Sequence, residues 1–390
     1  MKILFITPDI PHLYGGGAGR MYYEIKYLHI NNISVDLMTY DIENKYNSDV
    51  FGFLNKYYLV KVNHNFSNKL SRIIKPYPYY KNFENQLLEI IKLNDYDLIH
   101  VHKFQMASYL SNIKNIPIII DLWACGLEGV WNEFVYESNF LIKFRKFLRI
   151  PKYYFSDIID YNKFSNFFVV SDKAKNYILN KYKNKNVYIV PNGLEYITEN
   201  NKKNEKESFN LIFTGDMGFY PNIDAVIYFY SNIYTHIKKE IKDLRFYIVG
   251  RNPVKEIVDL SKNDSSVIVT GMVDDIKKYL LIGDIFVAPL RCGLGIRNKI
   301  LEAMGSGVCV VGFPNAFEGI DVINGENAIL CDSNKIFIDK IIFLYKNKQI
   351  ALNIGSNAKR VIKEKYMWNN IVNNMVKNYY EILNNYNNKR

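Results

Sequence analysis

Short apolar runs recur along the chain, separated by longer polar stretches that have helical character. In the first half the runs lie at residues 3–7, 35–40, 97–102, 116–123, 166–171 and 186–191. In the second half they lie at residues 209–215, 244–250, 266–271, 284–290, 307–313 and 326–332. Continuous runs of Ile, Val and Phe are typical of parallel strands that are buried on both faces. Because strand and helix patterns alternate throughout, we predict an α/β fold with two doubly wound, Rossmann-like domains.

A polar stretch separates the two halves. A chain of 390 residues is too long for one typical core, and residues 196–208 have the charged composition of a linker. We therefore expect an N-terminal domain over 1–195 and a C-terminal domain over 209–367. Residues 368–390 follow with an amphipathic pattern and are expected to form a helix that crosses back to the first domain. Two such domains facing each other would form a central cleft, where ligands bind in this architecture.

The chain is basic, with a net charge of +11 from 50 Lys and Arg against 39 Asp and Glu. This excess favours an anionic substrate or an anionic membrane surface, and a biased genome composition is the alternative explanation. The sequence contains no helix-turn-helix, zinc-finger or aromatic RNA-binding pattern, so we expect no nucleic-acid partner.

The cysteines and the apolar runs bear on the compartment. Neither a C-x-x-C spacing nor a tight His cluster accompanies the four cysteines, which predicts neither a zinc site nor a disulfide framework. No apolar run reaches the length needed to cross a bilayer, and the chain starts directly with a strand pattern that leaves no room for a signal peptide. We expect a cytoplasmic protein, with peripheral binding to the inner face of the plasma membrane as an open alternative.

The most informative stretch lies at residues 289–304. An apolar strand pattern breaks there at two glycines, and a helix pattern begins with Arg297 and Lys299 on its first turns. A glycine loop that leads into a helix presents free backbone N–H groups and a positive dipole end to an anion. Glu302, one turn further, can accept hydrogen bonds from sugar hydroxyls. The stretch therefore predicts a site for a sugar–phosphate compound.

A second glycine run, Gly15-Gly16-Gly17, follows the first strand and precedes a helix expected over residues 21–28. Consecutive glycines let the backbone approach a ligand closely, although a flexible strand–helix loop is the simpler interpretation of a lone glycine run. The loop is too long and its spacing differs from the dinucleotide fingerprint, which argues against a nicotinamide cofactor.

Polar residues also stand at the ends of several predicted strands. His102 and Asp121 end two strands of the first half and are candidates for contact with substrate; purely structural roles are the alternative for each. In the second half, Gly215, Arg251 and the segment 269–273 end three successive strands. Together they place loops suited to phosphate and base binding at one edge of one sheet.

The motifs that carry a family resemblance extend over nearly the whole chain. They are Gly15–Gly17, Asp97–His102, Val169–Ser171, Val190–Gly193, Phe213–Gly215, Pro221-Asn222, Ile248–Arg251, Leu301–Met304, Gly325–Ala328 and Lys365–Trp368. In order and spacing the chain resembles retaining glycosyltransferases of the GT-B fold, specifically glycosyltransferase family 4 of the group 1 type. The C-terminal motifs are the more specific ones.

The chain departs from the usual family pattern at two places. The usual family motif carries two glutamates eight residues apart; the second matches Glu302, and the first falls on Leu294, which cannot accept a hydrogen bond from a donor sugar. The chain resembles the family subgroup with a Pro-Leu-Arg-x-Gly-x-Gly-x-Lys/Arg-x-Lys pattern. A basic residue often found after the first C-terminal strand is also missing near Gly218, and Arg297 with Lys299 would replace it.

The resemblance implies a set of donor-binding residues. Glu302 would bind the ribose hydroxyls, Lys299 would neutralise the diphosphate, and Gly215 and Arg251 would belong to the same site. The residues lining the diphosphate would be Gly295, Ile296 and Arg297, with Gly15, Gly16 and Gly17 closing over it. Met272 and Val273 would flank the base.

The resemblance also implies the chemistry. Fixed cations and N–H dipoles would stabilise the nucleoside diphosphate as it leaves, so we expect no metal and no cofactor beyond the nucleotide-diphosphate sugar substrate. Retention would proceed by same-face attack on an oxocarbenium-like centre, without the two-carboxylate scheme of retaining glycosidases. Asp121 and His102 are the candidate catalytic residues, orienting the acceptor or stabilising the cation.

Residues 140–153 combine five cations with a dense apolar pattern. A basic amphipathic helix of this kind can lie on anionic lipid, and a helix packed on the N-terminal sheet with solvated Lys and Arg is the alternative.

The sequence thus predicts a retaining glycosyltransferase that moves a sugar from a nucleotide-sugar donor to a glycan or lipid-linked acceptor in bacterial surface polysaccharide biosynthesis. Two alternatives remain open: a catalytically silent GT-B subunit that partners another glycosyltransferase, and a GT-B nucleotide-sugar epimerase.

Overall fold

The chain folds into two compact units. The computed structural model describes residues 1–13, 16–41, 48–62, 77–123, 126–135, 140–197, 208–293 and 295–388. The first unit comprises Met1–Asn192 and Trp368–Arg390, and the second comprises Gly193–Met367. The C-terminal segment therefore belongs to the same unit as the N-terminus.

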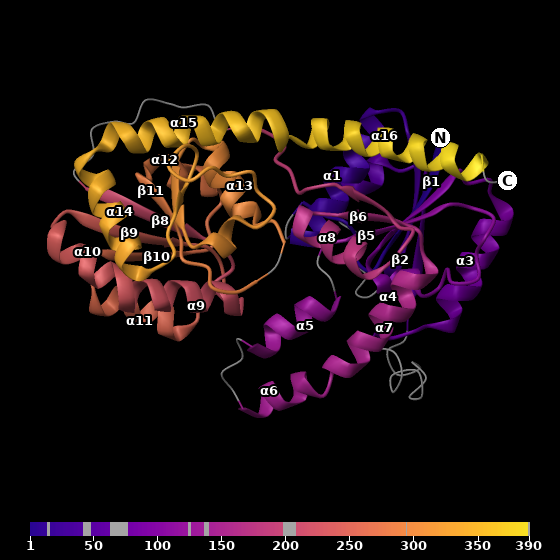
Figure 1. The fold of residues 1–390 in the computed structure, drawn as a ribbon, viewed down its shortest axis with the longest axis horizontal. Helices are drawn as coiled ribbons and strands as arrows, with labels where there is room; N and C mark the ends of the chain where they lie inside the picture. Colours follow the sequence, from indigo (N-terminus) through magenta and orange to yellow (C-terminus); the bar gives the residue numbers. More distant parts are fainter. Residues whose placement is uncertain are drawn as a thin grey trace. The chain divides into compact units, whose positions relative to one another are not determined.

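The first unit contains a seven-stranded parallel sheet in the order β3-β2-β1-β4-β5-β6-β7 (Figure 1). Its strands are β1 (Lys2–Thr7), β2 (Ser34–Asp41), β3 (Lys56–Lys61), β4 (Leu98–His102), β5 (Ile118–Leu122), β6 (Asn166–Val169) and β7 (Asn186–Ile189). Its helices are α1 (Gly16–Ile30), η1 (Asp49–Phe53), α3 (Lys81–Leu93), α4 (Lys103–Ala107), α5 (Gly126–Val135), α6 (Phe140–Phe147), α7 (Ile150–Lys163), α8 (Asp172–Lys181) and α16 (Trp368–Asn387).

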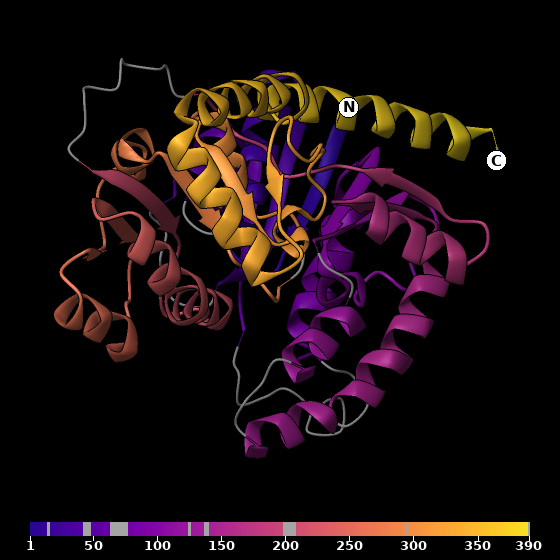
Figure 2. The ribbon, with the colours of Figure 1, turned by 60° about the vertical axis from the view of Figure 1, so that its left-hand side comes forward.

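Helices cover both faces of this sheet, which is why its strands are apolar on both sides. Successive residues of β1 point to opposite cores: Ile3 and Phe5 pack with α1 and α16, whereas Leu4 and Ile6 pack with α3, α4, α7 and α8. Figures 1 and 2 show α16 lying along α1 on one side of the sheet, and the two helices are in contact.

The second unit contains a six-stranded parallel sheet in the order β10-β9-β8-β11-β12-β13. Its strands are β8 (Phe209–Thr214), β9 (Leu244–Val249), β10 (Val267–Gly271), β11 (Ile285–Ala288), β12 (Cys309–Gly312) and β13 (Ile329–Leu330). Its helices are α9 (Tyr220–Phe229), η3 (Tyr230–Tyr234), α10 (Thr235–Glu240), α11 (Lys255–Asn263), α12 (Ile276–Ile282), α13 (Asn298–Gly305), η4 (Pro314–Phe317), α14 (Asn334–Lys346) and α15 (Lys348–Lys365).

In each sheet the order of the strands reverses once, between β1 and β4 and between β8 and β11. Chain connections leave such a point in opposite directions, which opens a crevice at the carboxyl ends of the strands. His102 ends β4, and Gly215 directly follows β8. The topology therefore brings the candidate residues of each unit to the edge where ligands bind in doubly wound folds.

The predicted α/β class with two parallel sheets is confirmed, and each of the twelve apolar runs contains a strand. Strand β3 was not predicted because it lies at the sheet edge, where Lys56, Tyr57 and Lys61 are exposed and the apolar signal is weak. Helix α1 begins at Gly16 instead of near residue 21, so the described part of the glycine run forms its first turn.

Among the described cysteines, Cys292, Cys309 and Cys331 are buried and free of disulfide bonds; Cys125 lies outside the described residues. Within the part of the chain that the structure describes, no helix is both long and apolar enough to span a bilayer.

Close packing of α15 on the second sheet depends on Gly355. A Cβ atom at this position would lie 2.1 Å from the carbonyl oxygen of Gly307. We expect Gly355→Ala to lower the free energy of unfolding by about 1–3 kcal/mol, because the helix must move away from its neighbour. Thermal and denaturant unfolding followed by circular dichroism measures the change.

The matched control is Gly52→Ala, since a Cβ atom there meets nothing within 4 Å. It should leave the stability unchanged or raise it by a few tenths of a kcal/mol. Equal stability of Gly355→Ala and the original protein would contradict the packing described for α15.

Candidate functional site

In the second unit, two side chains converge on the backbone at the carboxyl end of β8. Lys299, on the first turn of α13, donates from Nζ to Oδ1 of Asn222 at 2.6 Å, and Asn222 Nδ2 donates to the carbonyl oxygen of Asp216 at 2.9 Å. A Cβ atom on Gly215 would lie 2.8 Å from Lys299 Nζ and 2.7 Å from Asn222 Nδ2. Glycine at position 215 therefore leaves the space that the ammonium group and the amide occupy.

Lys299 and Glu302 lie one turn apart on α13, and both are partly withdrawn from water. Burial lowers the pKa of Lys299 to about 7, while the nearby Glu302 charge opposes the shift. Burial raises the pKa of Glu302, against the attraction of Lys299. Within the described parts of the chain the Glu302 carboxylate has no hydrogen-bond donor, so its oxygens keep their capacity to accept.

The loop before α13 curls around Arg297. Gly293 and Gly295 have φ angles of +105° and +71°, which side chains rarely tolerate. Arg297 donates from its Nη1 atom to the Gly295 carbonyl oxygen, and that atom lies 3.9 Å from a carboxylate oxygen of Glu318. Its Nη2 atom is buried without a hydrogen-bond acceptor among the described residues. The loop thus holds one N–H group that a ligand oxygen could satisfy.

Ile296 and Leu294 belong to the same loop. Ile296 is buried and helps to fix the loop. Leu294, which stands where the family motif has its first glutamate, lies outside the described residues.

Arg291 is a cation of the same loop with a different role. It binds both carboxylate oxygens of Asp224 on α9, with Nε at 3.1 Å from Oδ2, and its guanidinium stacks 3.9 Å from the ring centre of Tyr228. A two-point contact of this kind fixes geometry. Arg291 therefore ties the loop to α9.

The neighbouring strand ends carry the other predicted donor residues. Arg251, after β9, pairs from Nε with Oδ2 of Asp216 at 2.9 Å and stays about half exposed. The end of β9 approaches β8 closely, since a Cβ atom on Gly250 would overlap the carbonyl oxygen of Gly215 at 1.7 Å. After β10, Met272 is 80% exposed and Val273 is partly buried.

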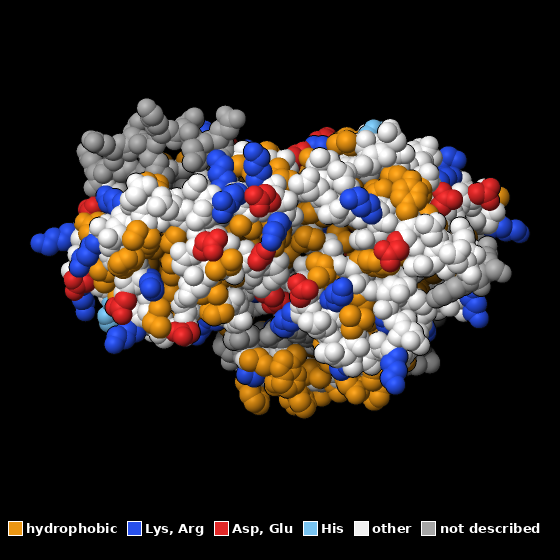
Figure 3. Space-filling view, turned by 45° about the horizontal axis from the view of Figure 1, so that its top comes forward, with side chains coloured by type: hydrophobic (Ala, Val, Ile, Leu, Met, Phe, Trp, Pro, Cys, Tyr) orange, Lys and Arg blue, Asp and Glu red, His pale blue; other side chains and the backbone are white. Residues whose placement is uncertain are grey.

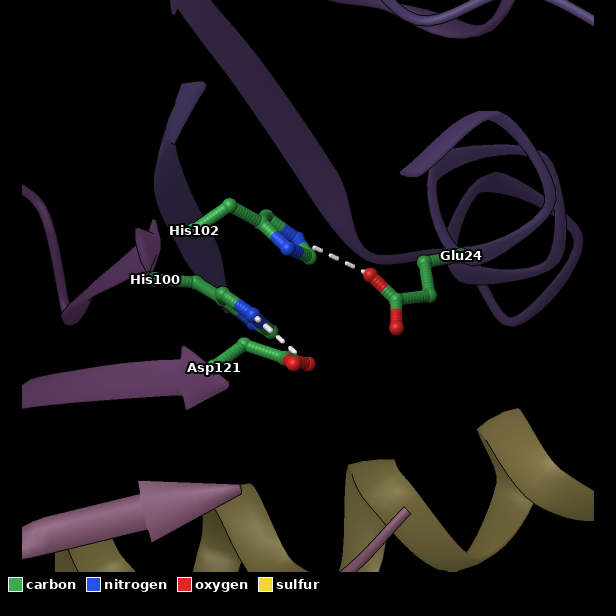
Figure 4. Close-up of side chains that lie close together, drawn as sticks. All are labelled: Glu24, His100, His102 and Asp121. Atoms are coloured by element: carbon green, nitrogen blue, oxygen red, sulfur yellow. Dashed lines mark ion pairs between the residues drawn. The ribbon is translucent and has the colours of Figure 1, made fainter. Parts of the chain in front are cut away.

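In the first unit, the ends of β4 and β5 meet α1 in a buried charged network (Figure 4). Arg20 Nε lies 2.9 Å from Oε1 of Glu24, and its Nη2 atom lies 2.8 Å from Oδ2 of Asp121. His102 Nε2 lies 3.0 Å from Oε2 of Glu24, and His100 Nε2 lies 3.6 Å from Oδ2 of Asp121. All five side chains are at most 1% exposed.

Trp123 determines which nitrogen of His102 carries the proton. The indole Nε1–H donates to His102 Nδ1 at 3.1 Å, and an indole can only donate. The neutral ring therefore carries its proton on Nε2, where it faces Glu24. Burial lowers the pKa of His102 to about 3, which keeps the ring neutral at physiological pH.

The carboxylates of the network depend on Arg20. Burial alone would raise the pKa of Asp121, but the charge of Arg20 outweighs it and lowers the pKa. Burial raises the pKa of Glu24, and Arg20 again opposes the rise. Arg20 also donates from Nη1 to the Val190 carbonyl oxygen at 2.9 Å and to Asn192 Oδ1 at 3.1 Å. One guanidinium thus connects α1, β5 and the segment that follows β7.

The network has the donor types of a transition-metal site. One ligand atom from each of Glu24, His100, His102 and Asp121 lies within 4.8 Å of the others. Arg20 already pairs with both carboxylates, however, and a metal ion would bring a second positive charge against its guanidinium. The cluster therefore fits a metal poorly, and Arg20 supplies its positive charge.

The structure gathers Gly215, Arg297, Lys299 and Glu302 in one unit, with Arg251, Met272 and Val273 on adjacent strand ends. Gly16 and Gly17 lie in the first turn of α1, and Gly15 lies outside the described residues. Asp121 and His102 lie side by side, opposite each other in the register of β4 and β5, but both are fully buried. Their roles stay predictions.

Sequence reasoning missed Arg20, Glu24 and Asn222. The first two are opposite charges four residues apart on one helix, a spacing that signals an ion pair. Nothing in that spacing distinguishes a buried pair from a solvated one. Asn222 belongs to the Pro221-Asn222 motif, but its contact with Lys299 spans 77 residues and leaves no local signal.

Two family profiles match the chain. One, described as Glycosyltransferase Family 4, matches residues 14–196, and the other, described as Glycosyl transferases group 1, matches residues 208–347. Together they span most of both units.

Two curated proteins are distant relatives. The first is an uncharacterized 44.6 kDa protein in the cps region of Klebsiella pneumoniae, 24% identical over 164 residues, which are 40% of this chain and 42% of that protein. The chain thus matches less than half the length of this relative. The second is chitobiosyldiphosphodolichol beta-mannosyltransferase of Candida glabrata, 22% identical over 303 residues, which are 67% of each chain.

Solved structures share the fold at low identity. TarM of S. aureus matches with a TM-score of 0.73 and 16% identity over 98% of both chains. Sucrose-phosphate synthase of Thermosynechococcus elongatus matches with a TM-score of 0.72 and 15% identity over 98% of both chains. Anabaena HepE in complex with UDP matches with a TM-score of 0.69 and 15% identity over 98% of this chain and 100% of that one.

Gly17 leaves room for Trp123, because a Cβ atom on it would lie 1.7 Å from the indole ring. We expect Gly17→Ala to displace the ring, to break its hydrogen bond to His102 and to lower the free energy of unfolding by about 1–3 kcal/mol. Thermal unfolding and tryptophan fluorescence measure the two effects.

Gly16→Ala is the matched control, because a Cβ atom one residue earlier meets nothing within 4 Å. Its stability should equal or slightly exceed that of the original protein. Identical spectra and stabilities for both variants would show that Trp123 does not pack on Gly17.

Proposed function

We propose that this chain, which belongs to glycosyltransferase family 4 of the group 1 type, transfers a sugar from a nucleotide-sugar donor to a glycan or lipid-linked acceptor, with retention of configuration. The biological setting that we propose is the assembly of bacterial surface polysaccharide. The cps region of the Klebsiella relative and the dolichol-diphosphate acceptor in the name of the Candida relative support this choice.

The cluster of Lys299, Asn222 and Gly215 carries the proposal. A diphosphate placed over Gly215 would meet no side chain from that residue and would reach the ammonium group of Lys299. The unsatisfied Nη2 atom of Arg297 offers a second donor. Positive groups held in a partly dry site stabilise the charge that develops on the diphosphate as the glycosidic bond breaks. UDP and UDP-glucose in Anabaena HepE, a protein of the same fold, support this class of donor.

Glu302 would bind the ribose. Its carboxylate has no donor among the described residues, and two adjacent hydroxyl groups of a ribose would satisfy its two oxygens. Met272 and Val273 would flank the base, and Arg251 would add positive charge at the next strand end. With Lys299 and Arg297 in place, the proposed reaction needs no metal ion.

Asp121 and His102 would act by positioning. Both are buried, and both of their partners, Arg20 and Glu24, are on α1. The network would hold the first turn of α1, where Gly16 and Gly17 lie, and the Trp123 ring in a fixed arrangement. Direct contact of either side chain with an acceptor would require α1 or Trp123 to move.

The donor site is tested by substituting its two charged residues. We expect Lys299→Ala and Glu302→Ala each to weaken binding of the correct nucleotide about 10- to 100-fold, the effect of losing a charge-assisted hydrogen bond. Isothermal titration with a panel of UDP, GDP, dTDP and CMP measures it, and circular dichroism checks the fold.

Lys278→Ala, which removes an exposed cation of the same unit, is the control and should leave affinity unchanged. Unchanged affinity in both site variants would contradict the assignment. Failure of the original protein to bind any nucleotide would favour a catalytically silent subunit, and conversion of a UDP-sugar to its epimer without transfer would favour an epimerase.

Donor affinity should fall as the pH rises above about 7. The diphosphate binds the protonated form of Lys299, whose pKa in the free protein is lowered to about 7. Above that pH, Lys299 is neutral in the free protein and must take up a proton when the diphosphate binds. Donor affinity should therefore drop by up to about tenfold per pH unit. UDP-glucose is the suitable probe if the base is uracil, since its doubly esterified diphosphate does not titrate in this range.

Lys299→Arg separates this effect from other titrations, because a guanidinium stays charged throughout. The donor affinity of this variant should stay constant between about pH 6 and pH 9, the interval in which Lys299 loses its proton. An equally steep fall in this variant would show that another group titrates.

A further inference from the structure

Helix α6 of the first unit exposes an unusual amount of apolar surface. Five of its eight residues are large hydrophobics, and none of its residues is buried. Phe140 and Leu141 are 78% and 71% exposed. Figure 3 shows the hydrophobic side chains gathered at the lower edge of the molecule, where α6 and the start of α7 lie in Figure 1.

The apolar residues follow helical spacing. Phe140, Phe144, Phe147 and Leu148 stand at positions i, i+4, i+7 and i+8 and so share one face of the helical turn. On α7, Tyr154, Phe155 and Ile159 are exposed as well. Single exposed hydrophobics are ordinary, but a contiguous set of this size marks an interaction surface.

Cations accompany this surface and carboxylates do not. Residues 140–156 contain five Lys and Arg and no Asp or Glu. They are Lys143, Arg145, Lys146, Arg149 and Lys152. Lys143 lies over the ring of Phe134 on α5 and donates to the carbonyl oxygen of Val135. Arg145 and Arg149 are exposed, and Arg149 donates to the hydroxyl oxygen of Tyr153. Long cationic side chains of this kind can reach anionic headgroups beside an apolar surface.

The surface is firmly attached to the core through α7. Tyr161, near the end of that helix, is fully buried, stacks on Tyr182 and meets Phe104 edge to face. Ser156 donates to Asp160 one turn later. The exposed start of α7 and the adjoining α6 therefore extend from a fixed base.

We propose that residues 140–156 are a docking surface for an anionic lipid bilayer. Helix α6 has eight residues and cannot span a membrane, but it can lie in the interface with its phenylalanines among the acyl chains. Charge selects this partner. A second copy of the same surface would bring five cations against five, whereas anionic headgroups neutralise them. The inference does not depend on the donor or acceptor proposed above.

The test uses the full-length protein and sedimentation with vesicles of phosphatidylcholine, with and without one third of phosphatidylglycerol. The original protein should bind the anionic vesicles, and high salt should weaken binding. Arg145→Gln with Lys146→Gln should lower the partition coefficient about 30-fold, since each surface cation contributes about fivefold. Phe140→Ser with Phe144→Ser should lower it at least about tenfold through lost apolar burial.

Matched controls change the same residue types elsewhere in the first unit. Lys173→Gln with Lys183→Gln removes two exposed cations of α8 and the turn after it, and Ile30→Ser with Leu93→Ser removes two exposed apolar side chains. Both pairs should bind vesicles as the original protein does. Circular dichroism and thermal unfolding, measured in parallel without lipid, should be the same in all variants and show that each is folded.

Three results would overturn the proposal. They are no binding to anionic vesicles, equal loss of binding in the controls, and a dimer in sedimentation equilibrium that the Phe140→Ser and Phe144→Ser changes abolish. The last would identify a second copy of the chain as the occupant of this surface.

Discussion

A parallel sheet that is covered by helices on both faces leaves few places for polar side chains. Its strands must be apolar on both sides, and their backbone groups are already paired within the ladder. Polar side chains are therefore concentrated near the strand ends and on the helix turns that face them, and a buried exception within a strand, Asp36 of β2, is paired with three side chains. Both units follow this constraint: the Lys299 cluster lies where β8 and β11 end, and the Arg20 network lies where β4 and β5 end.

The two clusters meet the cost of desolvation in different ways. Arg20 faces two carboxylates and two further oxygen acceptors, so its charge is matched within the protein. Removing one partner of such a buried pair typically costs about 3–5 kcal/mol, because the remaining charge is left without compensation. Lys299 has one amide acceptor and a carboxylate one turn away, and its pKa is lowered to about 7. An incompletely matched charge of this kind is what a ligand-binding site requires.

The fold was largely predictable from the sequence because its signal is local. Among the described residues, continuous apolar runs predict every strand except β3, whose edge position allows Lys and Tyr to face water. The helix that contains Trp368 was predicted from its amphipathic pattern, and it packs on the first sheet. The sequence places the start of α1 too late, because consecutive glycines indicate a loop, although Gly17 lies in a helix turn where Trp123 leaves no room for a Cβ atom.

The candidate sites were predictable in outline only. Gly215, Lys299 and Glu302 could be found because glycine loops and charged helix starts have a spacing of their own. That Asn222 meets Lys299 could not be found, since 77 residues separate them. The burial of His102 and Asp121 was even less predictable. Both stand at strand ends, as substrate-binding residues do, and their pairing with Arg20 and Glu24 leaves no local signal in the sequence.

Burial also distinguishes residues that a ligand can reach from residues that only fix neighbouring elements in place. The neutral His102 uses both ring nitrogens, one to accept from Trp123 and one facing Glu24, so no lone pair remains for a substrate proton. Asp121 is held ionised by Arg20 and lacks access to water. Buried polar atoms without a hydrogen bond among the described residues occur in both clusters: Nη2 of Arg297 in the second unit, and atoms of Glu24, His102 and Asp121 in the first. The difference between the clusters is access, because Arg297, Lys299 and Glu302 are only partly buried. A ligand can reach partly buried groups but not the network around Arg20, whose side chains are at most 1% exposed, which is why the second unit is the stronger candidate for donor binding.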